Sequence, residues 1–157
     1  MNYKMKDVCR RIIRGLMLAI AVFLLTAALA VSIANNAIAY GMEKELLALP
    51  LPEGATVVSS TSAAGKLIGN GNGMQYFAAV LLESDRPLAE LQEHFAAYVE
   101  KNDRPYLVVR QEGERIAAVE NQKLTFRKTA ENGYILYFYD NSRRPMQGWL
   151  DLDLRGH

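Results

Sequence analysis

The strongest pattern in the chain is an uninterrupted apolar run near its beginning. Residues 15–34 read GLMLAIAVFLLTAALAVSIA, in which Thr26 and Ser32 are the polar side chains. A helix of about twenty residues spans roughly 30 Å, the thickness of the hydrocarbon core of a bilayer. The run therefore predicts a transmembrane helix over residues 15–40, and the lipid bilayer is the first partner that the sequence indicates.

The charges on the two sides of this run differ in sign. Residues 1–14 hold five basic side chains and one acidic side chain, a net charge of +4, and are predicted to be a basic cytoplasmic segment. Residues 43–157 hold thirteen basic and sixteen acidic side chains, a net charge of −3. By the positive-inside rule we expect a single-pass protein of the cell membrane, with a cytoplasmic N-terminus and an extracytoplasmic C-terminal domain.

A cleaved signal peptide is the main alternative for the apolar run. Residues 28–30 (ALA) and 37–39 (AIA) both have the small-x-small form of a cleavage site. The run is longer than the roughly 7–15 apolar residues of a typical signal peptide, so we favour an uncleaved signal-anchor. The lone cysteine, Cys9, precedes the run, whereas a lipoprotein signal places its cysteine at the end.

The residues after the run predict a connection to a folded domain. Asn35 and Asn36 are expected to lie in the headgroup region, and hydrogen bonding between helices of an oligomer is the alternative. Residues 41–54 (GMEKELLALPLPEG) are expected to be a linker. Its Leu-Pro-Leu-Pro piece should be extended, because proline disfavours helix at the preceding residue.

Residues 55–157 predict one α+β domain. A single helix is expected after residues 84–87 (SDRP), because Leu88, Leu91, Phe95 and Tyr98 recur on one helical face. The Gly-rich run 69–73 (GNGNG) and the later pair at 132–133 predict hairpin turns. We expect a mostly antiparallel sheet with the helix packed on one face. β-Branched or alternating stretches predict its strands at residues 55–60, 74–83, 106–110, 116–119, 124–128, 134–140 and 149–154.

Composition excludes several classes of function. The net charge of +1 disfavours a nucleic-acid partner. One cysteine excludes an intrachain disulfide, and two histidines leave little for a histidine-rich metal site. The glycine-rich run has neither the spacing nor the following helix of a phosphate-binding loop. The sequence thus identifies no catalytic, cofactor-binding or metal-binding residues, and we expect a binding domain rather than an enzyme.

A candidate binding surface follows from the aromatic strand at residues 134–140 and from two loops. Alternation places Tyr134 and Phe138 on one face of the strand and Tyr137 and Tyr139 on the other. One face should pack under the helix, and the other would present an aromatic pair suited to recognition of a sugar, peptide or protein. The candidate binding residues are Tyr137, Tyr139, Asn70, Asn72, Arg143 and Arg144.

The alternative function is a secreted or membrane-anchored hydrolase that uses carboxylates brought together by the fold. The candidate carboxylates, which the sequence does not pair, are Glu83, Asp85, Asp140, Asp151 and Asp153. We expect Asp151 and Asp153 to form a solvated face of the last strand, because no calcium-loop pattern surrounds them. His94 lacks a nearby nucleophile motif and is expected to be a boundary residue of the helix.

Two stretches, LPLPEGATVVSSTS and QYFAAVLLESDRPLAELQEHFAAYV, carry a resemblance to a known kind of protein. With the basic N-terminus and single apolar run, the chain resembles small single-pass membrane proteins of Gram-positive bacteria that carry an extracytoplasmic α+β domain. The resemblance covers about residues 5–100. It implies the membrane topology and brings no catalytic or binding residues.

Overall fold

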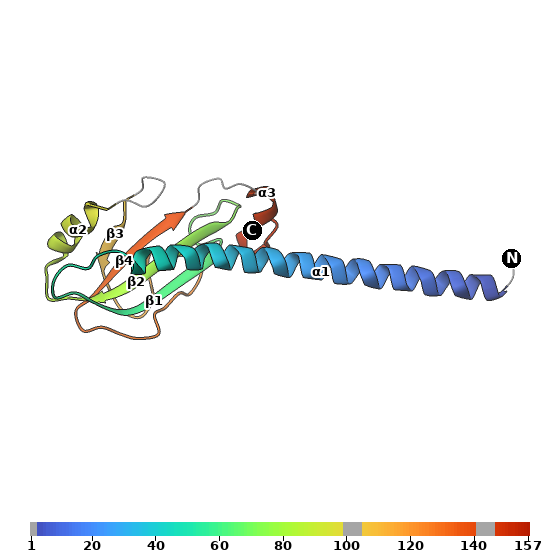
Figure 1. Cartoon of the computed structure of the whole chain (residues 1–157), viewed down its shortest axis with the longest axis horizontal. Coiled ribbons are helices and arrows are strands. Elements are labelled where there is room, and N and C mark those ends of the chain that lie inside the picture. Colours follow the sequence, from blue (N-terminus) through green and yellow to red (C-terminus); the bar gives the residue numbers. More distant parts are fainter. Residues whose placement is uncertain (1–2, 99–104, 141–146) are drawn as a thin grey trace.

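The computed structural model describes residues 3–98, 105–140 and 147–157. A long apolar helix is followed by a small antiparallel sheet and a second helix, which confirms the predicted α+β class (Figure 1). The helices are α1 (Tyr3–Leu47), α2 (Leu88–Ala96) and α3 (Gln147–Leu150), with a 3-10 turn η1 (Leu154–Gly156). The strands are β1 (Thr56–Gly65), β2 (Gln75–Glu83), β3 (Leu107–Arg110) and β4 (Gly133–Asp140).

The sheet has the strand order β1-β2-β4-β3, and every neighbouring pair is antiparallel. β2 and β4 are therefore the inner strands, and both are almost entirely buried. β1 and β3 are the edge strands. The register of β1 shifts between Val57 and Ser59, after which Thr61 lies opposite Ala79 of β2.

Helix α1 continues well beyond the predicted transmembrane segment and corrects the prediction of a linker at residues 41–54. Residues 41–47 are its last turns, so the connection to β1 begins only after Leu47. At 1.5 Å per residue, its 45 residues extend over roughly 67 Å. Figure 1 shows the first half of the helix projecting from the domain and the last half lying along the sheet. Residues 41–47 continue the helix because they contain no proline and include strong helix formers.

The last turns of α1 form part of the domain core. Their buried residues Asn35, Ala39, Met42 and Leu46 are spaced by four, three and four, which places them on one helical face. Ala39, Met42 and Leu46 pack with Leu91 and Phe95 of α2 against one face of the sheet. The predicted buried stripe of the second helix is confirmed at Leu91 and Phe95, and Tyr98 is half-buried beside it. Residues 99–102, the expected end of that helix, lie outside the described residues.

The start of α2 has no side-chain cap. Pro87 occupies the N-cap position and makes no capping hydrogen bond with its side chain. The hydroxyl of Ser84 instead accepts a hydrogen bond from the backbone N–H of Arg86, in a turn that precedes the helix. The proline still fits this place, because its missing N–H is not needed at a helix start.

The opposite face of the sheet is covered by residues 111–132, which connect β3 to β4. Ile116 and Val119 are buried there against Phe77 and Ile135 of the sheet. The strands predicted at 116–119 and 124–128 are wrong: the described pairing in this connection is a single bridge between Arg115 and Thr125. The local reason is a turn in which Val119 donates to the Ile116 carbonyl, so both side chains point to the core.

The two predicted Asn-Gly turns have different outcomes. Residues 66–74 do connect the antiparallel strands β1 and β2, as expected of a hairpin, although the loop is longer than a tight turn. Gly69 and Gly73 have positive φ angles of 66° and 126°, which favour glycine. Gly133, in contrast, is the first residue of β4, and the Asn132 side chain donates to the Asp85 carboxylate.

The strand predicted at residues 149–154 is also wrong. These residues form the last turn of α3, a bend and the start of η1. Leu152 and Asp153 donate backbone hydrogen bonds to the carbonyls of Trp149 and Leu150, which closes a helical turn. The Asp153 side chain then accepts from the N–H of Arg155 and begins η1. An alternating pattern of six residues does not determine a strand when such local hydrogen bonds are available.

Candidate functional site

A buried polar network joins α1 to the rest of the domain. The Asn35 side chain is fully buried. Its Oδ1 accepts a hydrogen bond from the Tyr76 hydroxyl at 2.8 Å, and its Nδ2 donates to the Leu150 carbonyl and to Asp153 Oδ2, both at 3.0 Å. We call Asn35, Tyr76, Asp153 and Arg155 the junction network. At the point where α1 leaves the domain, it connects Asn35 to β2, 41 positions away, and to the C-terminal segment, 115 and 118 positions away.

Arg155 completes the junction network from the outside. Its Nη2 lies 2.6 Å from Asp153 Oδ2, while the same guanidinium donates to the Asn36 side chain at 2.9 Å and to the Ser32 carbonyl at 3.2 Å. The hydrogen bond from Arg155 holds the pKa of Asp153 well below its ordinary value, although burial opposes that shift. Asp153 in turn raises the pKa of Arg155. The pair is therefore ionised and fixed against α1.

The junction network gives Asn35 and Asn36 partners in the segment 148–157 of their own chain. It also corrects the prediction for the two late aspartates. Asp153 is buried, and the Asp151 carboxylate accepts a hydrogen bond from the N–H of Met74 at 3.0 Å, so the pair is not a solvated strand face. The sequence gives no local signal for these contacts, because each joins distant parts of the chain.

Two glycines allow the segment 148–157 to lie close to the β1–β2 hairpin. A Cβ at Gly156 would lie 2.9 Å from the Met74 sulfur and 3.2 Å from the Gly73 backbone. A Cβ at Gly65 would approach the Arg155 carbonyl to 3.1 Å. Backbone bonds from Lys66 to the Arg155 carbonyl (2.6 Å) and from Gly73 to the Gly156 carbonyl (2.8 Å) use this close approach.

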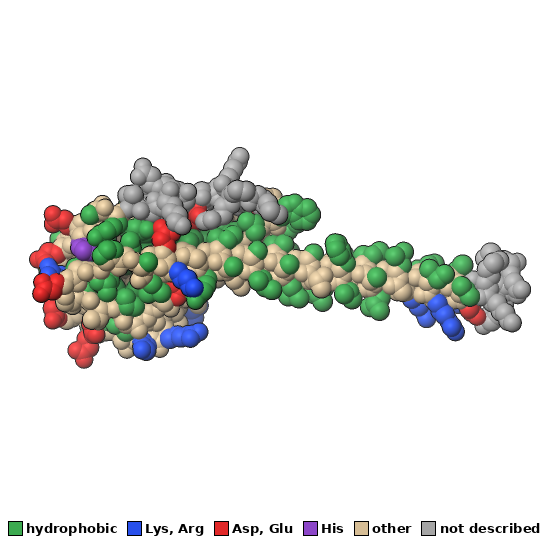
Figure 2. All heavy atoms as spheres, viewed as in Figure 1, with side chains coloured by type: hydrophobic (Ala, Val, Ile, Leu, Met, Phe, Trp, Pro, Cys, Tyr) green, Lys and Arg blue, Asp and Glu red, His purple; other side chains and the backbone are tan. Residues whose placement is uncertain are grey.

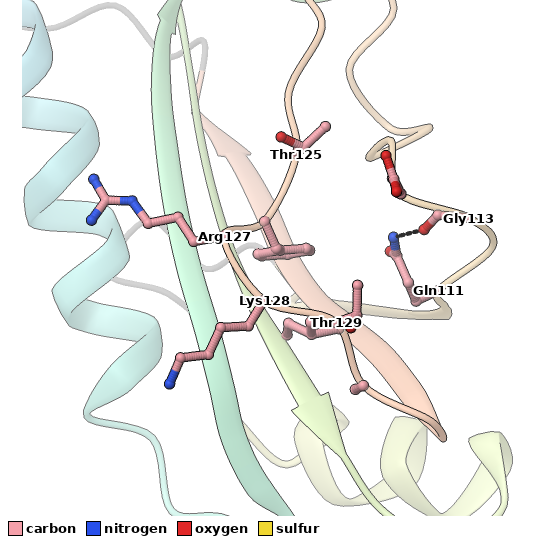
Figure 3. Close-up of a pocket in the computed structure, with 10 residues that line it drawn as sticks. Gln111, Gly113, Thr125, Arg127, Lys128 and Thr129 are labelled. Carbon is pink, nitrogen blue, oxygen red and sulfur yellow. Dashed lines mark hydrogen bonds between the residues drawn. The ribbon is translucent and has the colours of Figure 1, made fainter.

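A pocket of about 580 Å³ lies between two parts of the connection 111–132, above Leu81 of β2. In Figure 3, Gln111 donates a hydrogen bond to the Gly113 carbonyl on one side, and Thr125 and Thr129 lie on the other. The side chains of Arg127 and Lys128 extend away from Gln111. The volume of the pocket lies in the range of small-molecule sites. The polar groups described around it offer hydrogen bonds, and no acid and base are paired among them.

One feature of this pocket is an unpaired acceptor. Gln111 Oε1 is buried and has no hydrogen-bond partner within the described part of the chain. A buried acceptor left without a donor costs about 1–3 kcal/mol. A bound molecule or a water that donates a hydrogen bond to this oxygen would remove that cost.

A second recess follows the outer edge of β1. It has a volume of about 570 Å³ and shares Thr125 and Arg127 with the first pocket. The hydroxyls of Ser60 and Ser62 donate to the two carboxylate oxygens of Glu43, at 2.5 Å and 2.6 Å. We call this recess the edge groove; it is lined by Tyr40, Glu43, residues 59–62, Thr125 and Arg127.

The predicted binding residues that the structure describes do not lie in one place. Tyr137 and Tyr139 do face away from α1, as the alternation predicts, but both are half-buried under the connection 111–132, where the Tyr139 hydroxyl donates to the Ala118 carbonyl. Burial raises the pKa of both hydroxyls. Asn70 and Asn72 are exposed on the hairpin loop at the other end of β2 from α2. Arg143 and Arg144 lie outside the described residues.

The candidate carboxylates are separated into two groups. Glu83 and Asp85 line a pocket of about 330 Å³ with Glu131, where they accept hydrogen bonds from the Glu131 N–H and the Asn132 side chain. Asp151 and Asp153 lie at the junction with α1, and Asp140 is buried at the end of β4. These contacts explain Glu83, Asp85, Asp151 and Asp153 as supports of turns and of the junction.

The remaining candidates for chemistry also have structural partners or stand alone. His94 Nε2 lies 2.8 Å from the Pro50 carbonyl, and its ring packs against Phe95 and Tyr98. Cys9 is exposed on α1 and unpaired. Among the described residues, no group of three or more His, Cys, Asp or Glu side chains is arranged to hold a metal ion.

The first half of α1 is a surface of a different kind. Within the described residues it is the one helix long and apolar enough to cross a membrane. Its large apolar side chains from Val8 to Leu29 are exposed, and Figure 2 shows them covering the projecting helix, with basic groups gathered near its free end. Water would solvate such a surface poorly, because it buries none of its apolar area.

Comparisons with protein-family models, with curated proteins and with solved structures return no match.

Proposed function

We propose that this chain is a single-pass membrane protein that holds an α+β interaction domain on the outer side of the membrane. The observation that carries the proposal is the division of α1 into an exposed apolar half and a half built into the domain core. The exposed half has the length and composition of a membrane-spanning helix, and Arg10, Arg11 and Arg14 at its start favour a cytoplasmic N-terminus. A domain so attached stays at the membrane surface without a flexible spacer.

The edge groove is the surface that best supports the interaction role. Among the described residues β1 has a strand neighbour on one side, at β2, and its last residues contact η1, so a further strand could add to its outer edge along residues 59–62. An exposed edge strand is a template for pairing with another chain, and many domains bind extended peptides in this way. β1 has ten residues, and its small side chains would leave room for a neighbouring strand. We infer that the ligand is an extended segment of a partner protein.

The charges around the groove indicate what that segment carries. In Figure 3 the Arg127 side chain extends from the connection 111–132 toward α1. Among the described residues, none of the ion pairs includes Arg127. Glu43, by contrast, is occupied by its bonds to Ser60 and Ser62. An acidic residue in the bound segment would pair with Arg127. The competing function of Arg127 is protective, because a charged side chain beside an edge strand also discourages unwanted pairing with another chain.

A photo-crosslinking amino acid in the edge groove tests the proposed ligand. With the crosslinker at Thr61 in the full-length protein in its cells, we expect a discrete adduct whose cross-linked peptide is identified by mass spectrometry. Arg127→Glu should reduce that adduct several-fold, because it reverses the charge that the partner meets. Lys123→Glu, an equal charge change at an exposed neighbour outside the groove, should leave the adduct unchanged.

A crosslinker at Glu93, exposed on α2, is the matched control position. Equal adduct yields from Glu93 and Thr61 would show that the groove does not select a partner. Adducts from Thr61 that contain a second copy of this chain would replace the proposed ligand by self-association. An adduct increased by Arg127→Glu would support the protective role of Arg127.

A further inference from the structure

Three large apolar side chains are exposed together in the segment 148–157. The exposed fractions are 65% for Trp149, 62% for Leu152 and 87% for Leu154. The half-buried Leu150 lies between them, and its carbonyl accepts a hydrogen bond from Asn35. Single exposed leucines are common on protein surfaces, but a tryptophan and two leucines within six residues form a patch. We call Trp149, Leu152 and Leu154 the junction patch.

The position of this patch is set by the junction network. Arg155 bonds to the Ser32 carbonyl and to Asn36, so the segment is held beside the turn of α1 where the apolar run 15–34 ends. Figure 1 places α3 and the C-terminal residues at the end of the domain from which α1 projects. In Figure 2, hydrophobic atoms protrude at this same end, next to the exposed apolar surface of α1.

We propose that the junction patch is a second membrane contact, seated in the headgroup region of the leaflet from which α1 emerges. The inference rests on the proposed membrane span of α1. Two observations favour lipid as the occupant. The patch is held beside Ser32 and Asn36, at the turn of α1 where the exposed apolar run ends. It also contains a tryptophan, a residue type enriched at membrane interfaces. Arg155, 39% exposed beside it, would face lipid phosphates.

A second contact of this kind would fix the orientation of the domain. A single helix allows a domain to tilt and to rotate about the helix axis, whereas a patch beside the helix prevents both motions when it enters the interface. The junction network supplies the stiffness that this requires, because Asn35 and Asp153 tie the patch to α1 through buried hydrogen bonds. The edge groove would then be held at a constant height above the membrane.

The chain has one tryptophan, so the fluorescence of Trp149 reports on the patch directly. The full-length protein is placed in two kinds of phosphatidylcholine nanodisc. The lipids of one carry bromine on their acyl chains near the headgroup, and the lipids of the other carry it near the bilayer centre. We expect a blue-shifted Trp149 emission, protection from acrylamide, and stronger quenching by the shallow bromines than by the deep ones. The variant Trp149→Phe with Val57→Trp moves the probe to an exposed site at the start of β1 and should show water-like emission without lipid quenching.

The outcomes separate this inference from the proposed membrane span. If the protein stays in the disc after an alkaline wash but Trp149 remains accessible to acrylamide and insensitive to both brominated lipids, the second contact is overturned while the span stands. If the protein does not stay in the disc, the span itself fails. A blue shift that appears only when two copies share a disc, without lipid quenching, would assign the patch to a second copy and would also overturn the inference.

Discussion

A fragment that begins at Glu43 is expected to remain unfolded, whereas a fragment that begins at Val31 should fold as a soluble domain. The first fragment lacks Asn35, Ala39 and Met42, which are buried against β1 and β2. Burial of one large apolar side chain contributes about 1.5–3 kcal/mol, and a whole domain is stable by about 5–15 kcal/mol. Removal of these residues would also expose the sheet face that includes Tyr76. The free energy of unfolding of the fragment should therefore fall to about zero or below.

Circular dichroism and thermal melts of the two fragments make the comparison. The fragment from Val31 should melt cooperatively, and the fragment from Glu43 should show no cooperative transition. If both fragments melt at the same temperature, the last turns of α1 are an appendage rather than part of the core, and the expectation of a free linker at residues 41–54 would be restored.

Asp153→Asn should destabilise the domain by about 2–3 kcal/mol at pH 7 and progressively less at acidic pH. The substitution removes a buried charge whose partner, Arg155, is 39% exposed and can be hydrated, so the cost is below the full penalty for a buried pair. Because Arg155 lowers the folded-state pKa of Asp153, the carboxylate stabilises the fold above its unfolded pKa of about 3.9. That contribution is lost as the pH falls from about 4 through the folded-state pKa.

Urea titrations of the full-length protein in a mild detergent, at several pH values between 7 and 3, measure the difference. The gap between wild type and Asp153→Asn should be constant above pH 5 and should narrow below pH 4. Asp151→Asn is the matched control, because it makes the same substitution two residues away, at a carboxylate that accepts a hydrogen bond from the backbone N–H of Met74. A gap that does not change with pH would mean that the two residues do not form an ion pair in solution.

The elements that sequence reasoning predicted are those whose pattern is long and whose partners lie nearby. The apolar β2 and the aromatic β4 have the composition of inner strands, and Leu91 and Phe95 of α2 show helical spacing over two turns. The C-terminal half of α1 also carries a readable signal at Asn35, Ala39, Met42 and Leu46. The apolar run before this half and the prolines after it favour a helix end near residue 40, which is seven residues before the observed end at Leu47.

The contacts that form the candidate sites cannot be predicted from local sequence patterns. Asn35 meets Asp153 across 118 positions of the chain, and no spacing predicts such a pair. The connection 111–132 has no clear periodicity, yet it covers Tyr137 and Tyr139 and creates the pocket beside Gln111. The edge groove likewise depends on the strand order, which places β1 at the edge of the sheet.

The central claim is that α1 crosses the membrane once, with its first residues in the cytoplasm and the domain outside. The lone cysteine allows a direct test with a membrane-impermeant maleimide on intact cells stripped of any wall. Cys9 of the full-length protein should react only after the cells are permeabilised. A Cys9→Ser, Asn70→Cys variant, with its thiol on the exposed hairpin loop, should react without permeabilisation. Labelling of Cys9 from outside, or a domain that carries no Cys9 because the apolar segment has been cleaved, would contradict the account.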